Sequence, residues 1–280
     1  MATTPFSADA VGLCVSTLRV RPAAIDRDIV EQTVRAAAAA GFPSLALQVN
    51  WVTTYGIDEM RALLDGLGMT AGVLEGSVTW SDGADAANRD ADQLLHVAAG
   101  IGAPLLHAAC IAPEGTPLPR AVEGFATLCD RADAYDIDVS HEFIPWYAYP
   151  SLEADLELVR EAGAPNGGVC IDLMHWHRQP GGPDLAALKE IPPERITYVQ
   201  LTDAPPTGTV ASADEYMAEC MSSRPIPGDG VVDVAGLLEA LVATGADPYV
   251  AYQVCNPTLA AEGSAVMAAR LRANVHQILA

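Results

Sequence analysis

The sequence predicts a single (β/α)8 TIM barrel over residues 1–280, and three observations predict it. Short β-rich runs alternate with amphipathic helical runs along the chain, which is typical of βαβ units around a parallel sheet. A length of 280 residues accommodates eight such units with few residues to spare. The first β-rich run, GLCVSTLRV, lacks the glycine-rich turn that an open, doubly wound sheet normally carries after its first strand.

The expected strands are short runs rich in aliphatic and β-branched residues, bounded by Gly, Pro or Asp. In chain order they are Gly12–Ser16, Ser44–Val49, Ala71–Leu74, Leu105–Ala109, Asp138–Phe143, Gly168–Asp172, Thr197–Thr202 and Tyr249–Val254. The helical runs between them are Asp26–Ala40, Ile57–Leu67, Ala84–Ile101, Ala121–Tyr135, Leu152–Ala162, Asp184–Lys189, Val234–Ala243 and Ala260–Ile278. The first helix shows the usual signals, an acidic cap at its start and Gly41 at its end. The long irregular stretch Ala204–Asp233 follows the seventh strand, which places it at the catalytic end of a barrel.

Composition excludes several classes of protein. Lys and Arg number 15 against 36 Asp and Glu, a net charge of −21, and phosphate recognition needs a basic face, so no nucleic-acid partner is expected. With 50% hydrophobic residues the chain is too apolar to be disordered. No window approaches the run of about 18 apolar residues that a membrane span needs. The first ten residues, MATTPFSADA, lack the pattern of a signal peptide, so a cytoplasmic location is expected.

The cysteines indicate buried thiols in a reducing compartment. They are scattered and contain no C-x-x-C pair, unlike a disulfide framework or a zinc site. They are Cys14, Cys110, Cys129, Cys170, Cys220 and Cys255.

Four late strands each carry one polar residue in an apolar setting. These are Glu142, Asp172, Gln200 and Gln253, on the fifth to eighth strands. In such barrels, residues at the carboxyl ends of the strands converge on the active site. Two carboxylates and two amide oxygens suit a hard divalent cation, with Mn²⁺ or Mg²⁺ the leading choices. The alternative for the glutamines is a hydrogen bond to the backbone, and for Glu142 a pair with an arginine.

The segments EFIPW, GVCIDLMHWHR, YVQLTDAP and RPIPGDGVVDVAGLLEAL, in this order, resemble the xylose-isomerase-like sugar isomerase/epimerase family of TIM barrels. The same superfamily includes inosose dehydratases, dehydroshikimate dehydratases and endonuclease IV. The resemblance covers most of the chain and is strongest from Glu142 to Leu241. It implies that Glu142, Asp172, Gln200 and Gln253 bind the metal, and that His175 and Arg224 contact the substrate.

One departure from the family pattern bears on the reaction. Family epimerases typically use the first and last glutamate as two proton-transfer bases, but the eighth strand here carries Gln253, which cannot exchange that proton. Glu142 remains as the expected base, with His175 or His177 as the acid. A one-base proton shift or a β-elimination fits this set better than a two-carboxylate epimerisation.

Two arginines and the tryptophans complete the candidate site. Arg178 and Arg224 lie on loops of the catalytic end and can bind an anionic group, or pair with Asp203 or Asp229. The tryptophans all follow predicted strands, which suggests an aromatic mouth that stacks on the substrate. They are Trp51, Trp80, Trp146 and Trp176. His141, which neighbours Glu142, is expected to point toward the helices and to be structural. His107, in LLHAAC, can face the barrel interior and is a further candidate.

The leading functional prediction is a divalent-metal-dependent sugar isomerase or epimerase. It would act on a small polyhydroxylated carbonyl compound through an enediolate-like intermediate. A lyase or dehydratase of the same fold is the close alternative, and a non-catalytic barrel or subunit is the third. The expected partner is a sugar-like small molecule, without nucleic acid or membrane, and the chain is compatible with a homo-oligomer.

Overall fold

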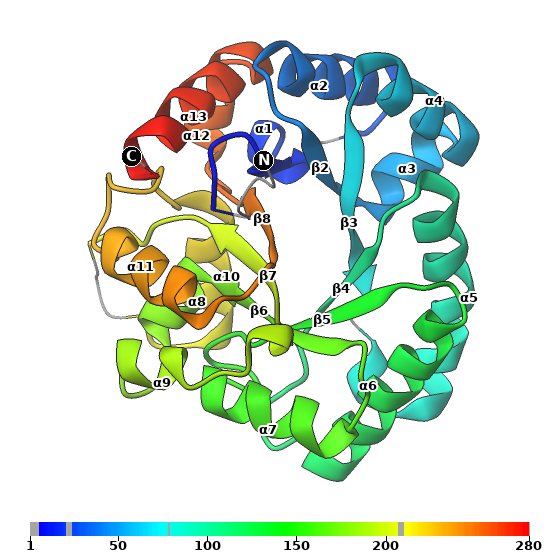
Figure 1. The fold of residues 1–280 in the computed structure, drawn as a ribbon, viewed down its shortest axis with the longest axis vertical. Helices are drawn as coiled ribbons and strands as arrows, with labels where there is room; N and C mark the ends of the chain where they lie inside the picture. Colours follow the sequence, from blue (N-terminus) through cyan, green and yellow to red (C-terminus); the bar gives the residue numbers. More distant parts are fainter. Residues whose placement is uncertain (1–5, 21–23, 78, 207–209, 280) are drawn as a thin grey trace.

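The computed structural model describes residues 6–20, 24–77, 79–206 and 210–279. Within these residues eight parallel strands pair in sequential order and close into a barrel, and the helices surround it (Figure 1). The strands are β1 (Gly12–Cys14), β2 (Ser44–Gln48), β3 (Thr70–Ser77), β4 (Leu105–Ala109), β5 (Asp138–Glu142), β6 (Gly167–Asp172), β7 (Ile196–Leu201) and β8 (Tyr249–Tyr252). The predicted TIM barrel and each predicted strand are confirmed.

Strand alternation decides which side chains enter the barrel. A compact inner cluster fills its middle with small and medium side chains, and a larger cluster packs the outer strand faces against the helices. The inner cluster is Cys14, Ala46, Val73, Leu105, Cys170, Tyr198 and Ala251. The residue two positions after each inner residue faces the same interior, closer to the carboxyl ends of the strands. Because of this two-residue periodicity, polar side chains line the interior at the carboxyl ends of the strands.

The helices are α1 (Val15–Leu18), α2 (Arg27–Ala39), α3 (Val49–Tyr55), α4 (Ile57–Leu67), α5 (Ala84–Ile101), α6 (Leu118–Asp133), α7 (Leu152–Ala162), α8 (Leu173–Arg178), α9 (Leu185–Lys189), α10 (Ala213–Ser222), α11 (Val234–Thr244), α12 (Pro257–Ala260) and α13 (Ser264–Ile278), with 3-10 turns at Trp80–Asp82 and Pro193–Arg195. The bounds of α4, α5 and α7 are as predicted. The last predicted helix starts later than expected, at Ser264, because Gly263 with its φ of 101° precedes the first residue of α13.

Five short helices were not predicted: α1, α3, α8, α10 and α12. Three of them begin directly after a strand, where too few residues are available for an amphipathic period to show. Helix α8 starts because the Asp172 carboxylate caps it, its Oδ1 accepting from the backbone N–H of His175 at 2.9 Å. The residues of α8 are therefore fixed relative to the end of β6.

The structure also bears on the predictions about the cysteines and about membrane-spanning segments. All six cysteines are free thiols and all are buried, as expected. Among the helices of the described residues, none combines the length and the apolar character that crossing a membrane requires.

Candidate active site

A cavity of about 400 Å³ opens at the carboxyl ends of the strands. Its wall includes Gln48, Glu75, His107, Glu142 and Gln253 from the strand ends, together with His175, Arg224 and residues of α10. Polar side chains reach this end of the barrel from every strand after the first. They are Gln48, Glu75, His107, Glu142, Asp172, Gln200 and Gln253. Of the residues predicted on β5 to β8, Glu142 and Gln253 line the cavity, whereas Asp172 and Gln200 lie behind its wall in contact with Arg224 and Glu142.

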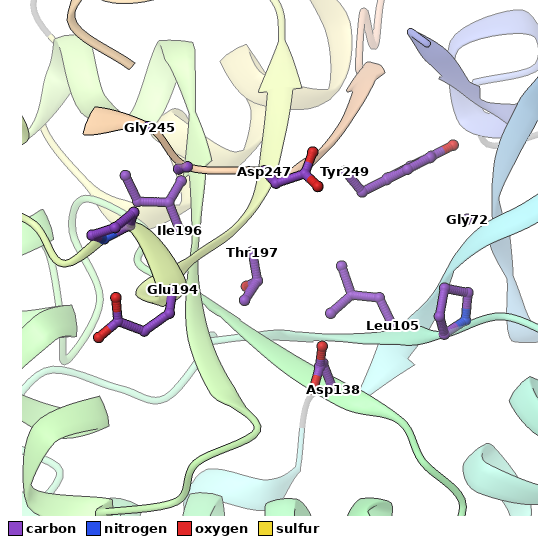
Figure 2. A pocket seen from close by; sticks show the side chains of 12 residues that line it. Gly72, Leu105, Asp138, Glu194, Ile196, Thr197, Gly245, Asp247 and Tyr249 are labelled. Atoms are coloured by element: carbon purple, nitrogen blue, oxygen red, sulfur yellow. The ribbon is translucent and has the colours of Figure 1, made fainter. Parts of the chain in front are cut away.

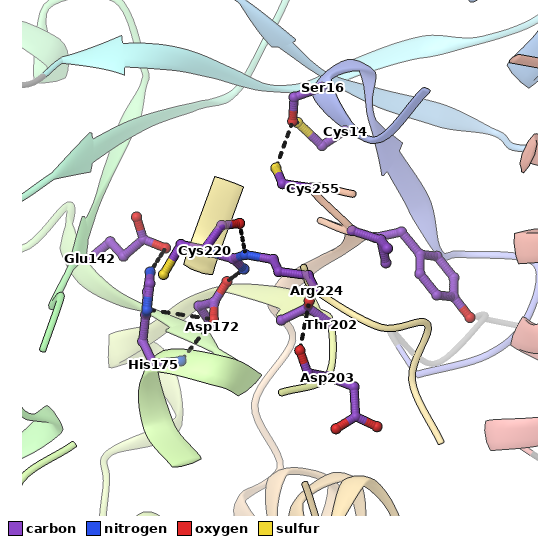
Figure 3. A network of polar contacts seen from close by, with 12 residues as sticks. Cys14, Ser16, Glu142, Asp172, His175, Thr202, Asp203, Cys220, Arg224 and Cys255 are labelled. Atoms are coloured by element: carbon purple, nitrogen blue, oxygen red, sulfur yellow. Dashed lines mark hydrogen bonds and ion pairs between the residues drawn. The ribbon is translucent and has the colours of Figure 1, made fainter. Parts of the chain in front are cut away.

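Glu142 is the centre of the polar network and is almost fully buried. One carboxylate oxygen, Oε2, lies 3.2 Å from Nε2 of His107 on β4. The other, Oε1, lies 3.7 Å from Nε2 of His175 (Figure 3). A carboxylate with an imidazole beside each oxygen can exchange protons with both rings, which suits acid–base chemistry.

Gln200 joins the two buried carboxylates. The terminal amide group of its side chain lies 2.9 Å from Asp172 Oδ2 and 2.8 Å from Glu142 Oε1. With its nitrogen toward them, this amide donates a hydrogen bond to each carboxylate. With its oxygen toward them, the three side chains present three oxygens to one point, which is a ligand set for a hard cation. The predicted proximity of Glu142, Asp172 and Gln200 is therefore present.

Asp172 is ion-paired with Arg224, which is itself buried (Figure 3). The Nη1 of Arg224 donates to Asp172 Oδ2, and its Nε donates to the backbone carbonyl of Cys220 at 2.8 Å. Burial alone would raise the pKa of Asp172, but the guanidinium of Arg224 and the ring of His175 hold it below its usual value. Asp172 therefore stays a carboxylate in the apolar interior.

His175 is held from the side opposite to Glu142. Its Nδ1 lies 2.7 Å from the hydroxyl of Tyr216, a buried residue of α10. Burial raises the pKa of Tyr216, so the phenol keeps its proton and can donate it to Nδ1. With the phenol as donor, the proton of the neutral imidazole resides on Nε2, which faces Glu142 and the cavity. Burial also lowers the pKa of His175, with Asp172 and Glu142 opposing that effect.

Gln253 supplies the strongest sign that something binds here. It follows β8 directly, lines the cavity, and has a buried Oε1 without a hydrogen-bond partner among the described residues. A buried, unpaired carbonyl oxygen is costly, and a cation or a substrate hydroxyl would satisfy it. Together with the carboxylates bridged by Gln200, this orphan oxygen fits a divalent metal ion.

Ligand atoms of His, Glu and Asp side chains also cluster tightly in the same place. Glu142, Asp172 and His175 bring such atoms within 4.8 Å of one another, and all three residues are buried. A second group with the same spacing joins Glu142 to His107 and Cys170. Burial raises the pKa of the Cys170 thiol, so its sulfur keeps a proton and is the weaker ligand. This buried cluster is consistent with a divalent metal site.

His177 and Arg178, both predicted site residues at the end of α8, lie away from the cavity wall. His177 is on α8 but does not line the cavity, and burial lowers its pKa. Arg178 donates to the backbone carbonyl of Pro205 at 2.6 Å and pairs with Glu219 at 3.1 Å. It therefore anchors the segment after β7 to α10, and its partner is Glu219 rather than either predicted aspartate. Arg178 therefore has a structural role in place of the expected substrate contact, and His177 lies outside the cavity where the acid was expected.

The expectation of an aromatic mouth is wrong for three of the four tryptophans. Trp51, Trp80 and Trp176 are buried in the core, because the short helices and the 3-10 turn after the strands fold them back against the barrel. Trp146 alone of the four is exposed, at 45%, with a left-handed φ of 75°. Such a conformation in a bulky residue is strained, and strain of this kind is concentrated at functional sites.

Sequence reasoning named only His107 in the early half of the site and missed Gln48 and Glu75. Gln48, Glu75 and His107 line the cavity from β2, β3 and β4. Burial raises the pKa of Glu75. Burial opposes a charge on His107, but the carboxylate of Glu142 raises its pKa above the ordinary value. The usable signal was strand alternation, since each of these residues stands two positions after an inner core residue.

His141 has the structural role that was expected. It is completely buried outside the barrel, where its Nδ1 contacts Oδ1 of the equally buried Asp155 on α7. The rings of Trp80, Phe125 and Tyr149 surround it. This tether fixes the strand immediately before Glu142.

Other hollows lack comparable chemistry. One of about 440 Å³ lies at the opposite, N-terminal end of the barrel and is lined by Asp138, Glu194, Thr197 and Asp247 (Figure 2). Another of about 910 Å³ is a groove between α7 and α9 on the outside. In neither hollow do the described residues form a tight cluster of metal-ligating side chains. The N-terminal end of such barrels serves stability rather than catalysis.

The chain is similar to known proteins in sequence. The family described as xylose isomerase-like TIM barrel matches residues 34–271. A 3-dehydroshikimate dehydratase of Pseudomonas putida is 30% identical over 125 residues, which are 44% of this chain and 19% of that relative. The chain therefore spans about a fifth of the length of this curated relative.

Solved structures share the fold at low identity. A structure described as IOLI protein with a bound zinc atom has a TM-score of 0.81 at 15% identity, and the match covers 96% of this chain and 98% of that one. An L-ribulose 3-epimerase has a TM-score of 0.73 at 15% identity, over 96% and 94% of the two chains.

Proposed function

Because the chain belongs to the xylose isomerase-like TIM barrel family, we propose that it is a divalent-metal-dependent lyase that removes water from a small polyhydroxylated carbonyl compound. The observation that carries this proposal is the make-up of the cavity. Glu142 stands beside the imidazole of His175, whereas the eighth strand offers the amide of Gln253 in place of a second carboxylate.

The proposed metal ligands are the oxygens of Glu142, Asp172, Gln200 and Gln253. A divalent cation held there would supply Lewis acidity, which polarises a carbonyl group and stabilises negative charge on its oxygen. Mn²⁺ and Mg²⁺ suit an all-oxygen ligand set. The IOLI protein, a structural relative, binds a zinc atom, so zinc belongs in any metal screen.

The proposed reaction uses the residues of the cavity in two proton transfers. Glu142 takes the proton from the carbon next to the carbonyl group, which leaves an enediolate-like intermediate. A carbon–carbon double bond then forms as the carbon–oxygen bond of the β-hydroxyl breaks. His175 donates its Nε2 proton to the departing oxygen, which leaves as water. A proton passing from Glu142 to His175, over the 3.7 Å between them, restores both groups.

Elimination fits this site better than two-base epimerisation. An epimerase that works on both faces of a carbon needs a second base, and a glutamine at position 253 cannot serve as one. The similarity to a curated 3-dehydroshikimate dehydratase supports the same reaction class.

Isomerisation by one base is the second candidate. A single carboxylate such as Glu142 can remove a proton from one carbon and return it to the neighbouring carbon on the same face. The cavity provides that carboxylate and a neutral acid for the carbonyl oxygen, which are the requirements for such a shift.

Product mass in deuterated water tests the proposal. The metal-loaded protein is incubated with a panel of ketoses and keto-polyols, and the products are measured by mass spectrometry. A product lighter by one water supports the lyase. An isomer of unchanged composition that has gained deuterium at carbon favours the one-base isomerase and contradicts the lyase.

A further inference from the structure

The cavity has a second polar wall that the proposed chemistry does not use. It consists of Gln48, Asn50 and Glu75, from β2, α3 and β3. In the closed barrel these elements lie across from β6 and β7, which carry Asp172 and Gln200. A substrate whose reacting end is near Glu142 would therefore place its far end against this wall.

Glu75 is held in a fixed orientation from below. It is only 7% exposed, with Oε1 accepting from the hydroxyl of Tyr198 at 3.2 Å and Oε2 accepting from the thiol of Cys14 at 3.1 Å. Each carboxylate oxygen can accept more than one hydrogen bond, so both keep accepting capacity on the cavity side. Hydroxyl groups are the donors that such a carboxylate recognises.

The two amides beside Glu75 are free to bind. The side chains of Gln48 and Asn50 have no recorded hydrogen bond to the part of the chain that the structure describes, and both line the cavity. A primary amide donates and accepts, as a hydroxyl group does, so each can match a hydroxyl in either direction.

This wall lacks a cation for an anionic group. Among the described residues that line the cavity, Arg224 is the only arginine or lysine, and its guanidinium is already paired with Asp172. The two histidines of the lining, His107 and His175, each lie beside a carboxylate oxygen of Glu142. A carboxylate or phosphate at the far end of a substrate would therefore face Glu75 without an unpaired counter-charge, at a cost in binding.

We propose that Gln48, Asn50 and Glu75 form a hydroxyl-recognition subsite that selects uncharged polyhydroxylated ketones and rejects substrates with an anionic far end. This inference rests on the proposed function, because it places the reacting end of the substrate at Glu142. It gives the chain a substrate class without the carboxylate of 3-dehydroshikimate, the compound in the name of its curated relative. Glu75 is the residue that determines this specificity.

Shikimate and its methyl ester test the subsite, because they have the same ring and hydroxyl groups and differ in one negative charge. Their dissociation constants for the Mn²⁺-loaded protein are measured by calorimetry at pH 8. The ester is expected to bind about tenfold more tightly to the wild-type protein, which corresponds to about 1.4 kcal/mol. In Glu75→Gln, which keeps the shape and an accepting oxygen, the preference should fall below about threefold.

A second variant, at Gln48, tests the proposal independently in case Glu75→Gln does not fold. Gln48 is half-buried, and Gln48→Arg supplies the missing cation, so this variant should bind shikimate more tightly than the ester. The proposal is overturned if shikimate equals the ester in the wild-type protein, if neither compound binds, or if both variants keep the wild-type ratio. The amount of Mn²⁺ bound in the same samples separates this failure from a failure of the metal-dependent function.

Discussion

Glu142 Oε1 and His175 Nε2 lie 3.7 Å apart inside a cavity at the end of the barrel. One group comes from the last residue of β5 and the other from a short helix capped by Asp172 at the end of β6. Two neighbouring strand ends thus bring a carboxylate and an imidazole, the proposed base and acid, to the same cavity without the help of a long loop. The pair can also exchange the proton that resets the site.

Replacing either member of this pair should remove most of the activity. Glu142→Gln and His175→Gln are each expected to lower kcat by about 10³-fold, the usual contribution of a positioned acid or base. The double variant should be little worse than either single variant, because groups that act as a unit are not additive. Steady-state kinetics of the four proteins check this. His177→Gln is the matched control and should stay within about threefold of wild type, and an equal loss there would contradict the assignment.

A carboxylate at position 253 should increase the affinity of the protein for its metal ion. Gln253→Glu replaces a neutral oxygen by a charged one, so Mn²⁺ should bind about tenfold or more tightly. Gln253→Leu, of similar size, should weaken binding by a comparable factor. Titration of free Mn²⁺ by electron paramagnetic resonance measures both. Equal affinity in all three proteins would show that residue 253 does not contact the ion.

Substitutions of the buried Trp176 and the exposed Trp146 distinguish a role in core packing from a role in substrate contact. Trp176→Ala empties a large buried volume and should cost about 3–5 kcal/mol of unfolding free energy. Trp146→Gly removes an exposed side chain and relieves a left-handed backbone, so stability should stay within about 0.5 kcal/mol or rise. Urea denaturation gives both values. A raised KM in Trp146→Gly would support the substrate contact predicted for that residue, and an unchanged KM would remove it.

The fold was predictable because each barrel unit repeats a local signal. Apolar strands of three to eight residues alternate with helices, and glycines end α4, α5 and α7 while the Ser151 side chain caps the start of α7. The late half of the site was predictable for a related reason. Polar residues such as Asp172 and Gln200 are conspicuous at the ends of strands that are otherwise apolar.

The early half was harder to predict from the sequence. Gln48 and Glu75 resemble ordinary polar residues, and their place in the site depends on closure of the barrel, which brings β2 and β3 to the same cavity. The prediction of an aromatic mouth was wrong for a different reason. The positions of the tryptophans after strands were predicted correctly, but short helices too brief to show a period, such as α3 and α8, turn Trp51 and Trp176 into the core.

Glu75 should make the stability of the protein depend on pH. Its pKa is raised by burial above the unfolded value, so the folded chain binds its proton more tightly than the unfolded chain does. The resulting stabilisation is complete below about pH 4.5, the unfolded pKa, and is lost as pH rises through the folded pKa. The groups that face Glu75 are Cys14, Tyr198, His107 and Glu142.

Glu75→Gln removes this titration and keeps the shape of the side chain. The unfolding free energy of the variant, relative to wild type, should therefore increase as pH rises from 4.5 to 8. Urea denaturation at several pH values, with metal removed from both proteins, measures the difference. A constant difference across this range would contradict the raised pKa.

The metal content of the purified protein tests the central claim most directly. After incubation with Mn²⁺ and removal of free ions, elemental mass spectrometry should find about one ion per chain in the wild-type protein. Asp172→Asn together with Glu142→Gln removes both charged ligands and should abolish this binding, while circular dichroism shows the barrel intact. A wild-type protein that retains no Mn²⁺, Mg²⁺ or Zn²⁺ under these conditions would contradict the four-strand metal site and the chemistry built on it.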